Sequence, residues 1–426
     1  MAKIGIYVFT DFIKQRVAKK RDTFFDGQNY IGLRYIVSEV SAYNEISYVS
    51  KDTINNVDFV LVSLTSYYDV ANLINELYGK KITSKIICGG AGYNNVDLLR
   101  EIVDFGIVGR GETLVPRLLD GDYEEGIYIK EKNINLTHQL KIQPLRKFIK
   151  IPDKILGMYD EKSVGCPRKC FFCEYSWKHK YSSDGKKYDS GLESREVLLQ
   201  DIDFSKYKNK DFVTAIDGAT EYTRRIINKP IKNREITEMC NKIYQDNVKD
   251  YVSLKLYCLL GYPFETRFYP DEVLDAVIKS RRTSNKRLNI VVVSPHFMPM
   301  PFSPMENEPV NWIDFREEIE KYDFNSIPKG NINLFWPSRL ASSPLSAAEA
   351  TVLNRGTIND IETIKSVLCS SKYKALKPII KRNVLEKYFG HLLGYCDEVH
   401  PYIMRSNDAS KAKELYRKRK EQYHAK

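Results

Sequence analysis

The chain contains 426 residues, of which 43% are hydrophobic and 28% charged, and its formal net charge is +11. The apolar fraction is sufficient for folded cores and excludes a globally disordered chain, and the length corresponds to two or three domains. Apolar runs such as 59–64 and 289–294 are much shorter than the roughly 20 residues that span a bilayer, so we predict no membrane segment. The positive charge favours polyanionic partners, although a lysine-rich solvated surface gives the same excess.

The first 130 residues alternate between short apolar stretches and helical patterns. The sequence predicts helices over 69–79 and 95–103, and strands over 3–9, 46–50, 57–64, 85–90 and 105–109. Residues 1–9 resemble a first strand more than a signal peptide, because a long apolar stretch with a cleavage site is missing. Near-continuous apolar strands separated by helices indicate a parallel α/β sheet covered on both faces.

Glycines follow two of these strands, at 89, 90 and 92 and at 109 and 111. The segment Gly89–Asn95 supplies G-x-G, but Asn95 stands where the dinucleotide fingerprint requires a third glycine. The glycines therefore indicate either tight turns or a ligand that approaches the backbone closely.

A second alternation follows a polar, lysine-rich connector over 131–154. Its predicted strands cover 211–218, 251–261 and 288–297, and its predicted helices cover 233–246 and 270–282. This order indicates a (β/α) barrel or part of one over 155–330. Helical patterns over 346–354 and 359–368 predict a helical C-terminal region over 331–426, which ends in a basic tail over 410–426.

Eight cysteines are too sparse for a disulfide scaffold and favour a reducing, cytoplasmic setting with a local metal site. Three are clustered as Cys166-x3-Cys170-x2-Cys173, and the others are scattered (Cys88, Cys240, Cys258, Cys369 and Cys396). Structural zinc normally takes two pairs of ligands, and the second pair is missing here. An iron–sulfur cluster fits the loop better, because thiolates bind its irons. Three thiolates would leave one iron of a [4Fe–4S] cluster open to substrate or cofactor.

The C-x3-C-x2-C spacing resembles that of the radical S-adenosylmethionine (SAM) superfamily. The resemblance implies that Cys166, Cys170 and Cys173 ligate a [4Fe–4S] cluster, with SAM chelating the open iron. One electron then cleaves SAM to methionine and a 5′-deoxyadenosyl radical, which abstracts hydrogen from substrate. Phe172 holds the position of the aromatic residue that lies near adenine in this family. Zinc binding or chance clustering is the alternative interpretation.

Three later segments resemble the family in the same order, so that the likeness spans about residues 155–310. In segment 214–230 the resemblance implies SAM contacts from the D-G-A-T-E stretch, and the candidates are Gly218, Thr220, Glu221 and Arg224, or Arg225 in its place. Segment 254–266 ends in G-x-P-x-E-T, matched by Gly261, Pro263, Glu265 and Thr266. Segment 293–305 is proline-rich and places Met298, Pro299 and Phe302 near adenine and substrate. Solvated arginines, a structural turn and a core methionine are the alternatives for these segments.

The N-terminal region resembles the Rossmann-like, cobalamin-binding-type domain that precedes the barrel in one branch of this superfamily. Many such domains carry Asp-x-His-x-x-Gly for the lower axial ligand, whereas this chain has no histidine before His138. We therefore favour a domain that only docks on the barrel over one that binds cobalamin without a histidine ligand.

These features predict a radical SAM enzyme with a single cluster. Only Cys88 lies in the N-terminal region, which disfavours methylthiotransferases, and Cys369 and Cys396 are too far apart to indicate a second cluster. The net charge, the basic tail and the Tyr/Lys-rich loop over 178–191 favour a nucleic-acid base or nucleotide as substrate. Rearrangement or methylation of a small metabolite or peptide is the second hypothesis. A non-catalytic nucleic-acid-binding protein with a structural metal site is the third. The enzyme would need a reducing electron donor of the flavodoxin or ferredoxin type.

Overall fold

The structure is a computed structural model of the whole chain. It describes residues 1–9, 31–122, 126–129, 136–137, 163–183, 212–246, 251–279, 287–322, 332–397, 403–404 and 407–424. The chain forms two compact units, the first of residues 1–161 and 349–407 and the second of residues 162–348 and 408–426. The chain leaves the second unit within α10 (Pro344–Arg355) and returns to it at α14 (Asn407–His424).

A six-stranded sheet in the order β2-β1-β3-β4-β5-β6 forms the centre of the first unit. Neighbouring strands are parallel except for β6, which runs antiparallel to β5. Most positions of β1, β3 and β4 are buried, which explains why the sequence shows them as apolar runs. The strands are β1 (Lys3–Tyr7), β2 (Glu45–Val49), β3 (Phe59–Ser63), β4 (Lys85–Gly89), β5 (Phe105–Ile107) and β6 (Ile127–Ile129).

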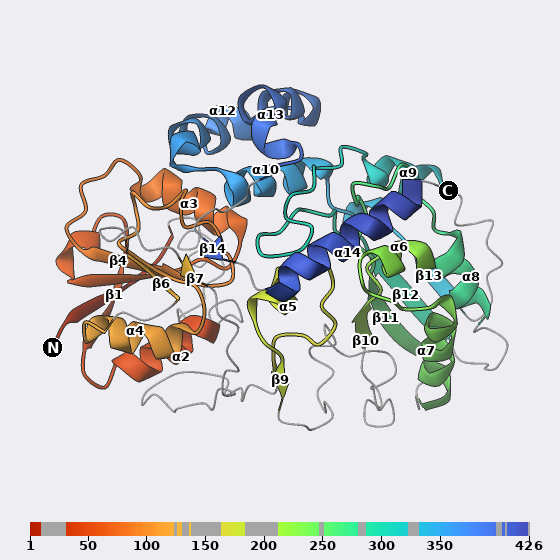
Figure 1. Cartoon of the computed structure of the whole chain (residues 1–426), viewed down its shortest axis with the longest axis horizontal. Coiled ribbons are helices and arrows are strands. Elements are labelled where there is room, and N and C mark those ends of the chain that lie inside the picture. The colour runs from red at the N-terminus through yellow and green to blue at the C-terminus, as the bar shows by residue number, and fades with distance from the viewer. Residues whose placement is uncertain are drawn as a thin grey trace. The chain divides into compact units, whose positions relative to one another are not determined.

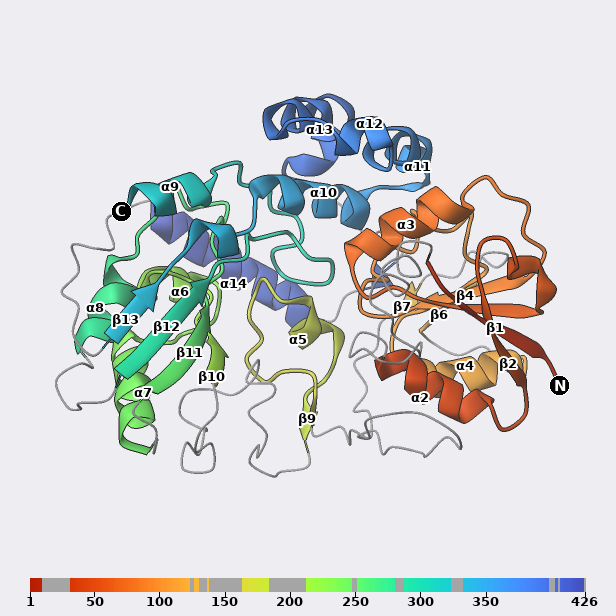
Figure 2. The same cartoon turned by 180° about the vertical axis from the view of Figure 1, so that it is seen from behind.

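Helices cover both faces of this sheet. In Figures 1 and 2, α2 (Ile31–Val40) and α4 (Gly111–Leu119) lie together on one face and α3 (Tyr67–Leu77) lies on the other. Helix α3 begins at a capping box in which Ser66 and Asp69 satisfy each other's backbone N–H groups. It confirms the helix predicted over 69–79. A short 3₁₀ helix, η2 (Ile54–Asn56), precedes β3.

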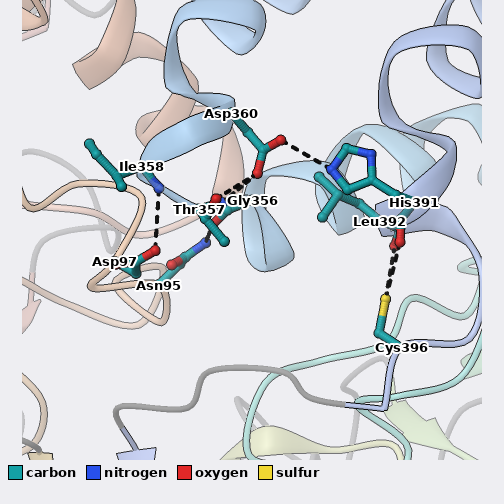
Figure 3. Close-up of polar contacts among 9 residues, drawn as sticks. All are labelled: Asn95, Asp97, Gly356, Thr357, Ile358, Asp360, His391, Leu392 and Cys396. Atoms are coloured by element: carbon teal, nitrogen blue, oxygen red, sulfur yellow. Dashed lines mark hydrogen bonds and ion pairs between the residues drawn. The ribbon is translucent and has the colours of Figure 1, made fainter.

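The helix predicted over 95–103 is wrong, because this segment is a run of turns. Figure 3 shows the side chains that hold it. The amide of Asn95 donates to Gly356 O at 2.6 Å, and the carboxylate of Asp97 accepts from Ile358 N at 3.2 Å. Asn95 also accepts from Leu98 N at 3.1 Å. The local bond from Leu98 N to Asn95 competes with helical hydrogen bonding. The two bonds to Gly356 and Ile358 hold the turns in place.

The segment that receives these bonds is helical and completes the first unit. Its elements are η7 (Ile358–Asp360), α11 (Ile361–Thr363), the π-helix η8 (Ile364–Leu368), α12 (Ser371–Lys374) and α13 (Pro378–Leu393). His391 of α13 bonds to Asp360 at 3.1 Å, and Cys396 contacts the Leu392 carbonyl, as Figure 3 also shows. The helices predicted over 346–354 and 359–368 are confirmed. The predicted connector over 131–154 lies outside the described residues apart from β7 (Leu136–Thr137), which pairs with β14 (Ile403–Met404).

Four parallel strands in the order β10-β11-β12-β13 form the sheet of the second unit. The strands are β10 (Phe212–Ala215), β11 (Tyr251–Tyr257), β12 (Arg287–Val293) and β13 (Ile332–Phe335). Alternate residues of β12, namely Leu288, Ile290 and Val292, are fully buried in a core shared with α7 (Asn233–Asp246) and α8 (Asp271–Lys279). Because β13 follows residue 330, this sheet extends beyond the predicted end of the barrel region.

The remaining helices of the second unit are shorter, apart from α14. They are α5 (Glu174–Lys178), α6 (Glu221–Ile226), α9 (Phe315–Lys321) and the 3₁₀ turn η6 (Ser338–Leu340). The predicted mixed α/β fold class is confirmed, with a mainly parallel sheet in the first unit and a parallel sheet in the second. Within the described residues, no helix is both long enough and apolar enough to cross a membrane.

Candidate functional site

The three clustered cysteines lie on a loop between β8 (Ser163–Val164) and α5. At its start Gly165 has a φ of 70°, and a Cβ there would lie 2.9 Å from the His179 oxygen. Lys169 also has a left-handed backbone, with a φ of 52°, which costs energy for a residue other than glycine. The loop therefore depends on its surroundings to keep this shape.

Backbone and side-chain hydrogen bonds hold the loop from several sides. Phe171 N donates to Ile227 O at 2.9 Å, and Met305 N donates to Phe171 O at 3.2 Å. The indole of Trp177 donates to the Cys170 carbonyl at 2.8 Å. These bonds fix the carbonyl of Cys170 and the backbone of Phe171 that follows it.

Burial governs the chemistry of the thiols. Cys170 is 6% exposed, and burial raises the pKa of its thiol to about 12 against the opposing charge of Lys229. Burial likewise raises the pKa of Cys173. Negative charge on Cys173 or Cys166 would raise the pKa of the Cys170 thiol further. Without a metal the buried thiols hold their protons at neutral pH, whereas a bound metal ion deprotonates a coordinating thiol.

The three thiols supply a donor set that suits an iron–sulfur cluster. Among the described residues, no group of three or more His, Cys, Asp or Glu side chains is arranged to hold a metal ion. Three cysteines on one short loop, of which Cys170 is buried, match the ligand chemistry of such clusters.

Tyr262 brings together the segments that follow the strands of the second sheet. Its ring is fully buried and lies edge-on to Phe172 of the cysteine loop, with centroids 6.1 Å apart. Its hydroxyl donates to Asp217 O, just after β10, at 2.9 Å. Its ring also packs against Phe297, which follows β12, at 5.3 Å. The structure thus gathers the cysteine loop and the three later motif segments around one tyrosine.

The segment after β10 forms the start of α6. Thr220 is the N-cap, and its hydroxyl accepts from Thr223 N at 3.0 Å. Gly218 packs so tightly that a Cβ would lie 3.0 Å from the Arg224 side chain. Glu221 is exposed, and its carboxylate accepts from Asn233 N at 2.8 Å. These residues have clear structural roles, and their SAM contacts stay predictions.

Arg224 is held by protein groups, and its contact with a SAM carboxylate stays a prediction. The side chain is 0% exposed, and its guanidinium donates to Ile231 O at 2.7 Å, to Gly218 O at 2.8 Å and to the Asn233 side chain. In this conformation the guanidinium is bound by three protein acceptors, and it therefore anchors the loop around α6. Its alternative, Arg225, is exposed and lies over the Tyr222 ring.

A buried ion pair beside the thiols was not foreseen from the sequence. The Lys229 ammonium bonds to the Asp217 carboxylate, and their side chains are 10% and 14% exposed. Burial lowers the pKa of Lys229, but Asp217 and Cys170 raise it by more, so that the ammonium stays charged. The D-G and N-K-P sequences carried no signal that these residues, on opposite sides of α6, would meet.

The turn after β11 is built on Gly261 and Glu265. Gly261 has a φ of 81°, and a Cβ there would overlap the His296 ring. The Glu265 carboxylate accepts from Gly261 N at 2.8 Å and from Tyr262 N at 3.1 Å. Burial raises the pKa of Glu265 to about 7.

The proline-rich segment after β12 is partly buried. Met298 is half-buried, whereas Pro299 is buried. Phe302 has a φ of 68°, and its backbone N–H donates to the Glu306 carboxylate at 3.0 Å. This left-handed position for a phenylalanine shows that the segment is tightly held.

The first unit has a cavity of about 80 Å³ at the carboxyl ends of β3, β4 and β5. Its lining combines glycines and aliphatic residues of these strands with the starts of α2 and α4, including Gly89, Gly90, Gly109, Gly111 and Glu112. Gly90 has a φ of 107°, and a Cβ there would collide with the Leu64 carbonyl. Close backbone packing therefore accounts for at least this glycine.

Comparison with known proteins gives few matches. No protein-family model and no curated protein matches the chain. The chain aligns with a structure of OxsB, a cobalamin-dependent S-adenosylmethionine radical enzyme, with aqua-cobalamin and SAM bound, at 10% identity and a TM-score of 0.34, covering 81% of this chain and 58% of that chain. An OxsB structure with aqua-cobalamin bound aligns at 9% identity and a TM-score of 0.25, covering 83% and 48%. This chain thus spans about half the length of those structures.

Proposed function

We propose that the protein is a radical SAM enzyme that cleaves SAM reductively and uses the resulting radical to abstract hydrogen from a substrate. The observation that carries this proposal is the convergence of the cysteine loop with three strand-end segments around Tyr262. In parallel α/β folds ligands lie at the carboxyl ends of the strands, and all three segments begin there.

Each part of this edge has a role in the proposal. Cys166, Cys170 and Cys173 would hold a [4Fe–4S] cluster, which when bound supplies the electron for SAM cleavage. The ring of Phe172 and the side chain of Met298, both half-buried, would contact the adenine. A reducing donor of the flavodoxin or ferredoxin type would deliver the electron.

Anaerobic purification tests this assignment directly. We expect about four irons with matching sulfide per chain, and 5′-deoxyadenosine from SAM and dithionite. One bound zinc without SAM cleavage would instead favour a non-catalytic nucleic-acid-binding protein with a structural metal site. Bound cluster without SAM cleavage would indicate an inactive scaffold.

We propose a nucleic-acid base or nucleotide as the substrate class. The net charge of +11 supports this, as does the surface of α12 and α13. Lys372, Lys374, Lys377 and Lys387 are exposed there, and Tyr388 is 45% exposed with the Lys387 ammonium 5.3 Å from its ring centre. Cations beside exposed rings suit phosphates and stacked bases. The Tyr/Lys-rich loop is described only over 178–183.

Salt-dependent binding of tRNA tests this substrate class. We expect affinity to fall steeply with salt. In a Lys372→Gln, Lys374→Gln double variant the slope of log affinity against log salt concentration should become shallower by about one to two. The matched control is Lys80→Gln, Lys81→Gln, at two exposed lysines. Equal effects of the two double variants, or no binding at low salt, would favour a small metabolite or peptide substrate instead.

Cobalamin is a second candidate cofactor for the first unit. The glycine-lined cavity at the strand ends supports it, whereas the absence of a histidine before His138 disfavours an axial histidine ligand. We favour a unit without cobalamin. An ultraviolet–visible spectrum after reconstitution with hydroxocobalamin should therefore show no retained cobalamin after gel filtration.

A further inference from the structure

Helix α14 belongs partly to the core of the second unit, although its sequence is strongly basic. Ala409, Ala412 and Tyr416 are buried at helical spacing, and Tyr416 is 1% exposed. They join one apolar cluster with Phe171 and Trp177 of the cysteine loop and α5. Figure 1 shows α14 passing beside α5 and α6. The basic segment therefore has a packed face in addition to its solvated one.

Arg419 makes the polar contacts of this packed face. Its guanidinium lies 5.4 Å from the centre of the Phe171 ring. The same group donates to Arg225 O at 2.8 Å and to the Asn228 side-chain oxygen at 3.2 Å. A planar guanidinium can stack on a ring while one of its nitrogens donates to two acceptors, whereas the compact ammonium of lysine cannot stack.

Asn228 connects Arg419 to the cysteine loop by hydrogen bonds. Its backbone is left-handed, with a φ of 58°. Its amide nitrogen donates to the carbonyls of Arg168 and Lys169 at 3.3 and 3.0 Å. Because Arg419 occupies the amide oxygen, the amide is fixed with its donors toward the loop. The closer of the two carbonyls belongs to Lys169, the left-handed residue directly before Cys170.

A second contact ties α14 to the other side of the loop. Lys420 pairs with the buried carboxylate of Glu308 at 2.6 Å. Glu308 N donates to Met305 O at 3.1 Å, and Met305 N donates to Phe171 O. Arg419 therefore contacts the ring of Phe171 directly, and the adjacent Lys420 is linked to the Phe171 carbonyl through Glu308 and Met305.

We propose that Arg419 is a positioning residue for the cysteine loop. Through Asn228 and Phe171 it holds the backbone of residues 168–171, including the left-handed Lys169 directly before Cys170. The consequence for cluster binding rests on the proposed function, whereas the effect on the loop does not.

Hydrogen–deuterium exchange on the cluster-free, full-length protein tests the effect on the loop. In Arg419→Ala the amides of Phe171 and Cys173 should exchange about tenfold faster, the change expected for losing a charged hydrogen bond. Arg419→Lys, which keeps the charge, should restore part of the protection. Asn228→Gly suits the left-handed backbone and should reproduce the faster exchange without threatening folding. Lys418→Ala, which removes an exposed charge from the same helix, is the control.

Iron and sulfide content and the visible spectrum after reconstitution form the second readout. Arg419→Ala should load less cluster than Lys418→Ala. If the unmodified protein binds no cluster but Arg419→Ala still speeds exchange, the proposed function fails and the positioning role stands. If Arg419→Ala and Asn228→Gly both exchange like Lys418→Ala, the positioning role is overturned whatever the cluster content.

Discussion

The two units place different chemistry at equivalent edges of their parallel sheets. In the first unit the strand ends of β3, β4 and β5 border a small cavity lined by glycines and aliphatic side chains, with Glu112 as a charged lining residue. In the second unit the strand ends meet thiols, a buried Lys229–Asp217 pair and a buried Glu265. The two sheets are similar in architecture, but the thiols, the ion pair and Glu265 all lie at the edge of the second sheet.

The largest effect is expected from Cys170→Ala. The remaining two thiolates would hold a cluster poorly, so iron and sulfide per chain should fall to background after reconstitution. Cys396→Ala, in the first unit, is the matched control and should load normally. Retained cluster in Cys170→Ala would remove the main chemical difference between the two edges.

The sequence predicted the parts of this comparison that depend on local pattern. The strands β1 to β5 and β10 to β12 and the helices α3 and α7 follow from apolar periodicity and spacing, whereas β6 and β13 were not predicted. It did not predict contacts that depend on tertiary packing. Asn95 and Asp97 turn a helical pattern into turns by bonding to residues more than 250 positions away, and Arg224 is drawn into a buried fork. Charge alone likewise gave no sign that α14 has a buried face.

Lys229→Met should have the next largest effect. It leaves the Asp217 carboxylate without its ion-pair partner in a largely buried place, which costs about 3 to 5 kcal/mol of unfolding free energy. Urea denaturation of the cluster-free protein measures the loss.

The double variant Lys229→Met, Asp217→Asn is the control for this prediction. It removes both charges and should recover most of the lost stability, because no uncompensated buried charge remains. A double variant as unstable as the single one would mean that Lys229 acts through packing, and the electrostatic contrast between the edges would weaken.

Titration of Glu265, at the second edge, should make the unfolding free energy depend on pH. Its pKa is raised to about 7 from 4.5, so its stabilising contribution is fully present below about pH 4.5 and is lost as the pH rises through 7. The shift corresponds to about 3 kcal/mol. Glu265→Gln keeps an oxygen for the two backbone donors and should lose much of this dependence. Unfolding free energies at pH 5 and pH 8 for both proteins measure it, and identical pH dependence in the two would contradict the assignment.

The smallest effect is expected at the first edge, from Gly109→Ala. Gly109 has a φ of 141°, but a Cβ there would lie 3.8 Å from the nearest atom, on Leu114. Backbone strain without a clash should therefore cost about 1 to 3 kcal/mol. Gly121→Ala, with a φ of 80° and open space around the Cβ, is the matched control away from the cavity. Similar losses of unfolding free energy in the two variants, with unchanged cluster content, would show that backbone conformation accounts for Gly109. A clearly larger loss at Gly109 would mean that the first edge needs that space, and would bring the two edges closer in function than their side chains indicate.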